Sequence, residues 1–87
     1  ESYKLDLKIG DAQIELFSFP HTPERPSRPE AQGLRHLAFS TDDIDKSMEI
    51  LRSENIQVEP IRIDELTGKR FTFFADPDNL PLELYEK

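Results

Sequence analysis

The sequence contains no cysteine and no tryptophan, and its 87 residues include only three glycines. The lack of cysteine excludes disulfide bonds, thiolate zinc sites and thiol nucleophiles. Basic residues are outnumbered, with 11 Lys and Arg against 18 Asp and Glu, which gives a formal net charge of −7. We expect no nucleic-acid partner, because phosphate binding needs a basic patch and the cations here are scattered among acids.

Long hydrophobic runs are also missing from the sequence. No apolar stretch approaches the length of a membrane span, and the first ten residues do not resemble a signal peptide. We therefore expect no membrane partner and a cytoplasmic protein. Eighty-seven residues allow one domain, and a chain of this length buries only about 60 to 65% of its unfolded surface. The core is therefore expected to be shared or supplemented.

Residues 1–19 read as a pair of strands. Apolar and polar residues alternate over 3–9, Gly10 and Asp11 suit a tight turn, and 12–19 form the predicted returning strand. Glu15 faces the same way as two phenylalanines, and there an ionised carboxylate needs a partner, a hydrogen bond or a metal ion. The alternative is that this face is solvated.

Residues 20–32 form a proline-rich connector between two halves of the chain. Prolines stand at 20, 23, 26 and 29, separated by charged and polar residues. Each proline removes a backbone donor and restricts φ, so an extended, polyproline-like segment is predicted.

Residues 33–87 carry the order strand, helix, strand, strand, strand. His36 lies in the first predicted strand, 33–40. Residues 41–43, Thr-Asp-Asp, supply N-cap candidates for an amphipathic helix that ends near Asn55. The next strand, 56–63, is interrupted by a proline that favours an edge or a bulge. The last two strands form a hairpin around the Asp-Pro-Asp-Asn turn at 76–79, and the second of them carries Glu83.

The sequence ADPDNLPLELYE in this hairpin resembles the closing hairpin of the vicinal oxygen chelate superfamily. That group includes glyoxalase I, methylmalonyl-CoA epimerase, fosfomycin and bleomycin resistance proteins and extradiol dioxygenases. The family usually has Gly at the position of Asn79, and Asn is the next-best residue for left-handed φ.

The resemblance implies an α+β fold in which two βαβββ modules pack side by side and enclose a cleft. Residues 33–87 would be one complete module, and 1–19 would be the last two strands of the other. We therefore expect a longer protein, with a strand, a helix and a strand ahead of Glu1.

Three side chains are candidates for chemistry: Glu15, His36 and Glu83. One histidine and two carboxylates can bind a divalent metal ion if the fold brings them together. By spacing alone, satisfied or solvated polar groups are the more common outcome for such residues. In the glyoxalase-like branch the ligands read His, Glu, His, Glu, and the resemblance assigns the second, third and fourth to Glu15, His36 and Glu83. The first histidine would lie in the segment ahead of this sequence.

The resemblance implies a lyase or isomerase similar to lactoylglutathione lyase. A bound Ni, Zn, Mn or Fe ion would stabilise the enediolate of a small α-oxygenated carbonyl substrate. Glu83 is the first choice for the general base and Glu15 the second. A homodimer is also implied. Arg35 and Arg70 are candidates to hold a substrate carboxylate, with solvated surface positions as the alternative.

Aromatic residues at strand spacing line either the cleft or the core. They are Phe17, Phe19, Phe71, Phe73 and Tyr85.

Two other functions are compatible with the same scaffold. A binding protein of the bleomycin resistance type would sequester a ligand without a metal, and it would have no need for buried acids at Glu15 and Glu83. A dioxygenase or thiol transferase is the third possibility. Glu15 disfavours the dioxygenase. The resemblance implies that such an enzyme would bind iron through two histidines and one carboxylate, with no ligand at the position of Glu15.

Overall fold

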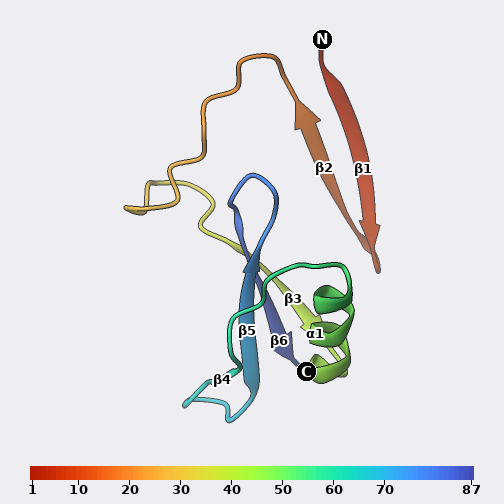
Figure 1. Ribbon diagram of the computed structural model, residues 1–87, viewed down its shortest axis with the longest axis vertical. Helices are drawn as coiled ribbons and strands as arrows, with labels where there is room; N and C mark the ends of the chain where they lie inside the picture. Colours follow the sequence, from red (N-terminus) through yellow and green to blue (C-terminus); the bar gives the residue numbers. More distant parts are fainter.

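A computed structural model describes residues 1–87 as two sheets and one helix (Figure 1). The helix is too short and too polar to cross a membrane. The predicted α+β class is confirmed. The elements are, in chain order, β1 (Tyr3–Ile9), β2 (Ala12–Ser18), β3 (Leu37–Thr41), α1 (Ile44–Ser53), β4 (Arg62–Ile63), β5 (Arg70–Ala75) and β6 (Pro81–Glu86).

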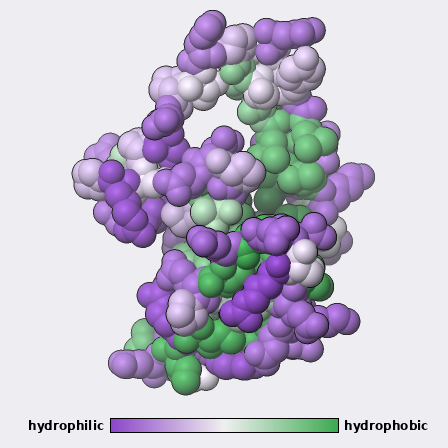
Figure 2. Space-filling view, in the orientation of Figure 1, coloured by the Kyte–Doolittle hydropathy of each residue, from purple (hydrophilic) through white to green (hydrophobic).

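Strands β1 and β2 form an antiparallel hairpin beside the rest of the chain (Figure 1). Gly10, at φ 57°, makes the tight turn between them, as predicted. Large apolar side chains along the hairpin remain exposed, and Figure 2 shows the apolar surface there. An isolated two-stranded hairpin is marginally stable in water, so this one needs a covering surface. The exposed apolar residues are Tyr3, Leu5, Leu7, Ile9, Leu16, Phe17 and Phe19.

The second sheet has four strands in the order β3-β6-β5-β4. Strand β6 lies in the middle, parallel to β3 and antiparallel to β5. The turn between β5 and β6 is held by Asp76, whose carboxylate accepts hydrogen bonds from the backbone N–H groups of Asp78 and Leu80 at 2.9 and 2.8 Å. Asn79 has φ 69°, so it takes the left-handed conformation expected of it.

Helix α1 covers one face of this sheet. Asp43 caps its first turn by accepting from the backbone N–H of Lys46 at 3.0 Å. Ile44 and Met48 point inward and meet Leu84 of β6 in a small core. The partly buried residues around this core are Phe39, Leu51, Val58, Ile61 and Phe74.

The connector of residues 20–32 is attached to the four-stranded sheet through Ser27. The Ser27 side chain is buried and donates to the backbone carbonyl of Asn79 at 2.7 Å. Arg25 donates to the Ser27 hydroxyl and to the carbonyls of Leu34 and Arg35. These hydrogen bonds of Ser27 and Arg25 hold the proline-rich segment against the β5–β6 turn.

Two predicted strands are shorter than expected. Strand β3 begins at Leu37 and not at residue 33, because the carbonyls of residues 34 and 35 bind Arg25 and not a neighbouring strand. The strand predicted over 56–63 is reduced to Arg62–Ile63. Pro60 lacks an N–H and interrupts the ladder, although the Glu59 N–H still donates to the Phe73 carbonyl at 3.0 Å.

Replacing Ile44 with Ala is expected to lower the free energy of unfolding by about 2 to 4 kcal/mol, because the side chain is completely buried between α1 and the sheet. Ile50→Ala, in the same helix, is the matched control, since Ile50 is 55% exposed. It should change the free energy by no more than about 0.5 kcal/mol. Urea denaturation of both variants measures the difference, and equal losses would show that α1 does not pack as described.

Candidate functional site

The face of the four-stranded sheet that points away from α1 carries the candidate site. Side chains alternate along each strand, so Thr72 and Leu84 face the helix while their neighbours face the other way. The register pairs Phe73 with Glu83 and Phe71 with Tyr85. These four side chains therefore share one surface, which we call the open face.

His36 and Glu83 meet on the open face. The His36 Nε2 and Glu83 Oε1 atoms lie 3.2 Å apart, a hydrogen-bonding distance. The Glu83 side chain is 14% exposed and that of His36 is 35% exposed. The imidazole also meets the edge of Phe73, with ring centres 5.2 Å apart at an angle of 77°. His36 lies one residue before β3, not inside a strand, yet it reaches the carboxylate of β6.

Glu15 is not part of this group. It lies on β2, where its carboxylate pairs with Lys4 of β1 at 3.0 Å and is 46% exposed. No group of three His, Cys, Asp or Glu side chains within residues 1–87 is arranged to hold a metal ion. The fold thus joins two of the three predicted ligands and leaves the third on the separate hairpin.

The donor types of the joined pair suit a divalent ion. Imidazole nitrogen and carboxylate oxygen are ligands that zinc, nickel, manganese and iron accept. His36 and Glu83 are already within one hydrogen bond of each other, so a small rearrangement could direct both toward one ion. They provide two ligands, and a complete site needs further donors from outside the open face.

Aromatic side chains and one cation, Arg62, border the His36–Glu83 pair. Arg62 was not among the candidates from the sequence. Phe71 stacks on Tyr85 at 6.2 Å, and the Arg62 guanidinium lies over Phe71 and Phe73 at 5.1 and 5.4 Å from their ring centres. The sequence shows no sign of this placement, because β4 has only two residues and shows no alternation that would indicate the direction of the Arg62 side chain.

Of the two arginines proposed from the sequence as carboxylate binders, Arg70 is engaged in ion pairs and Arg35 only in part. Arg70 binds Glu86 at 3.0 Å and Asp45 at 3.2 Å, linking β5 to β6 and α1. The backbone N–H of Arg70, then its guanidinium, hold the pKa of Glu86 below its usual value. Arg35 lies near Glu30 at 3.6 Å, and its buried Nη1 has no hydrogen-bond partner.

The β4–β5 loop is attached to the open face through Tyr85. The Tyr85 hydroxyl donates to Asp64 Oδ2 at 2.7 Å and is hydrogen-bonded to Thr67. This phenol, followed by the backbone N–H of Leu66, holds the pKa of Asp64 below its usual value. These contacts tie the loop after Arg62 to the middle strand.

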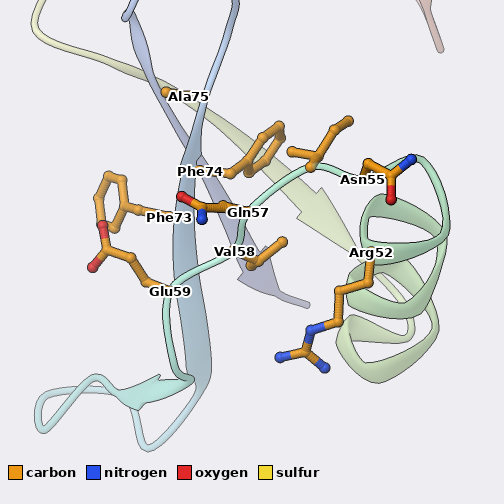
Figure 3. Close-up of a pocket in the computed structure, with 9 residues that line it drawn as sticks. Arg52, Asn55, Gln57, Val58, Glu59, Phe73, Phe74 and Ala75 are labelled. Carbon is orange, nitrogen blue, oxygen red and sulfur yellow. The ribbon is translucent and has the colours of Figure 1, made fainter.

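Two surface grooves flank the open face. One, of about 670 Å³, runs along the sheet edge past residues 55–59, and Figure 3 shows Phe73 and Phe74 on opposite sides of β5 there. The other, of about 730 Å³, lies between the end of β2, the connector and the β5–β6 turn. Neither is lined by His36 or Glu83. The pair therefore lies outside both grooves, on a sheet face where Glu83 is largely shielded and His36 is partly exposed.

Comparison with known proteins gives consistent matches over almost the whole chain. A family model described as the Glyoxalase/Bleomycin resistance protein/Dioxygenase superfamily matches residues 3–84. The chain is 64% identical to the uncharacterized protein YwkD of Bacillus subtilis strain 168, covering 99% of this chain and 68% of that protein. It is 65% identical to the uncharacterized protein YaeR of Escherichia coli K12, covering 100% of this chain and 68% of that protein.

Solved structures of similar proteins have the same fold as this chain. The glyoxalase family protein from Enterococcus faecalis has a TM-score of 0.88 and 53% identity, covering 95% of this chain and 66% of that one. Two more distant structures show the same fold: fosfomycin resistance protein FosX from Listeria monocytogenes (TM-score 0.70, 22% identity, 99% and 64% covered) and lactoylglutathione lyase from Agrobacterium tumefaciens (0.68, 23%, 95% and 67%). The chain thus spans about two thirds of the length of these proteins.

Replacing Tyr85 with Phe is expected to raise the pKa of Asp64 toward its usual value, because the main hydrogen bond to the carboxylate is lost. A depressed pKa in the folded state adds stability above about pH 4, which is lost as the pH falls through the folded pKa. The variant should therefore lose less stability than the parent over that acidic range.

Carboxyl NMR titration of Asp64 measures the shift directly. Tyr3→Phe is the control, since Tyr3 lies on the separate hairpin and makes no contact with Asp64. An unchanged Asp64 pKa in Tyr85→Phe would contradict the assigned contact.

Proposed function

Because the chain belongs to the glyoxalase/bleomycin resistance protein/dioxygenase superfamily, we propose that it is part of a metal-dependent lyase or isomerase. Its substrate would be a small α-oxygenated carbonyl compound, as for the lactoylglutathione lyase that shares its fold. The observation that carries this proposal is the contact of His36 with Glu83 on the open face.

His36 and Glu83 would hold the metal ion. A bound divalent ion would polarise a carbonyl oxygen of the substrate. The shielding of Glu83, at 14% exposure, favours a defined orientation of its carboxylate. The nearby Phe73 ring limits the rotation of His36 from one side.

Glu83 would also act as the general base. Its Oε1 is hydrogen-bonded to His36, while its Oε2 has no hydrogen-bond partner within the chain. Oε2 is therefore the atom available to take a proton from the carbon beside the substrate carbonyl.

Glu15 would complete the ligand set from a second copy of the chain. Its hairpin exposes seven large apolar side chains, and the side chains of the open face are only partly buried. A homodimer in which the hairpin of one copy lies over the open face of the other would cover both surfaces. Glu15 would then exchange its exposed contact with Lys4 for a place beside His36 and Glu83.

A metal-free binding protein of the bleomycin resistance type is the second candidate. The observation in its favour is that the chain alone brings together only two of the three predicted ligands. In that case the aromatic side chains of the open face would hold the ligand, and the His36–Glu83 contact would be an ordinary hydrogen bond.

We expect Glu83→Gln to weaken metal binding by about tenfold or more, because a charged ligand is replaced by a neutral amide of the same shape. The measurement is the metal content and the dissociation constant for added zinc or manganese in the full-length natural protein. Glu49→Gln, on the exposed side of α1, is the control and should bind like the parent. A parent protein that binds no added metal would support the binding-protein candidate instead.

Mixing two inactive variants tests whether the site is shared between copies. Glu15→Gln and Glu83→Gln should each bind metal poorly alone, whereas a refolded mixture should recover part of the binding. In a mixed dimer one of the two shared sites regains both carboxylates, while the other loses both. No recovery in the mixture, despite confirmed mixed dimers, would place all the ligands of each site in one copy.

A further inference from the structure

Arg62 occupies a defined position on the open face although it belongs to the shortest strand. It pairs with Phe71 in the β4–β5 ladder, so its side chain projects from the sheet on the same side. Its guanidinium carbon lies 5.1 Å from the centre of Phe71 and 5.4 Å from that of Phe73. Stacking on two rings orients the cation without using its N–H groups.

Most of the hydrogen-bonding capacity of Arg62 is unused. A guanidinium has five N–H donors in a fixed fork, and here a single contact is made, from Nη2 to Glu59 Oε1 at 3.4 Å. Both side chains are more than half exposed, so this ion pair is weak and easily exchanged. The guanidinium is therefore held by stacking of its planar faces, while most of its N–H groups remain free to bind an anion.

The cation is also close to the proposed reaction site. Phe73 touches both groups, with the guanidinium on one side and the His36 imidazole at its edge. Phe73 is also the direct partner of Glu83 in the register. A single aromatic side chain thus separates Arg62 from the His36–Glu83 pair, and one small molecule could contact both.

We propose that Arg62 determines substrate specificity by binding an oxyanion at the end of the substrate remote from His36 and Glu83. This inference rests on the proposed function, and it adds that the substrate carries a second group such as a carboxylate, phosphonate or phosphate. The planar fork makes two parallel hydrogen bonds to such a group. Phe71 and Phe73 would contact the carbon atoms between the two ends of the substrate.

Glu59 regulates the availability of this cation. Its carboxylate is the one group in the chain that accepts a hydrogen bond from the Arg62 guanidinium, and a substrate anion must replace it. The backbone N–H and carbonyl of Glu59 bind Phe73 and Thr72, whereas its side chain makes no other contact. Changing the side chain should therefore alter Arg62 without disturbing the sheet edge.

The test compares two probes that differ only in the remote anion, 2-hydroxyglutarate and 2-hydroxypentanoate. Both are titrated into the full-length natural protein, with and without zinc, and binding is followed by calorimetry and by the Arg62 Nε–Hε NMR signal. We expect the dicarboxylate to bind about tenfold more tightly and to shift the Arg62 signal. Arg62→Gln should reduce this preference to near unity, and Arg62→Lys should retain part of it.

Two further variants make the result specific. Arg28→Gln removes an exposed arginine of the connector and should leave the preference unchanged. Glu59→Gln should strengthen binding of the dicarboxylate about two- to threefold, because the competing carboxylate is lost. A purely structural role for Arg62 would not produce this opposite effect.

The outcomes separate this inference from the proposed function. Equal binding of the two probes, or an Arg62 signal that 2-hydroxyglutarate leaves unmoved, would overturn the role of Arg62 even if zinc binds. A dicarboxylate preference that depends on Arg62, in a protein that binds none of zinc, nickel, manganese and iron, would support the anion site and disprove the metal-dependent reaction.

Discussion

The alternation of side chains along β5 and β6 is the constraint on which the rest of the structure depends. One set, with Thr72 and Leu84, is buried under α1, and this burial provides the small core. The other set must then lie on the opposite face, where Phe73 and Glu83 stand side by side. Because β6 is the neighbour of both β3 and β5, the same geometry brings His36 to Glu83. Packing on one face therefore positions the polar groups on the other.

The hairpin of β1 and β2 has no face buried under a helix, unlike the four-stranded sheet. Its apolar side chains are exposed, and the Glu15 carboxylate contacts only Lys4 and Gln13 of the same hairpin. The open face of the four-stranded sheet is only partly buried, and neither groove is lined by His36 or Glu83. His36 and Glu83 meet on the four-stranded sheet while Glu15 lies on the hairpin, and this separation is the physical basis for proposing that the site is completed between copies.

Local features were predictable because they depend on neighbouring residues. The turn at Gly10, the left-handed Asn79 and the capped helix after Asp43 follow from backbone conformational preferences and short-range hydrogen bonds. The predicted strands over 33–40 and 56–63 were too long, because the bonds that shorten them come from Arg25 and from the edge of β5. Such long-range contacts leave no periodic signal in the sequence.

The sequence by itself determined the α+β class, the family resemblance and the types of residue available for chemistry, since each depends on local pattern and composition. The tertiary structure alone decided which of those residues meet. It joined His36 to Glu83, left Glu15 with Lys4, engaged Arg70 in ion pairs and placed Arg62 over two phenylalanines. The meeting of His36 with Glu83 depends on the strand order β3-β6-β5-β4, in which β6 is the neighbour of β3. Strand order is set by the packing of segments distant in sequence, so the spacing of residues along the chain does not encode it.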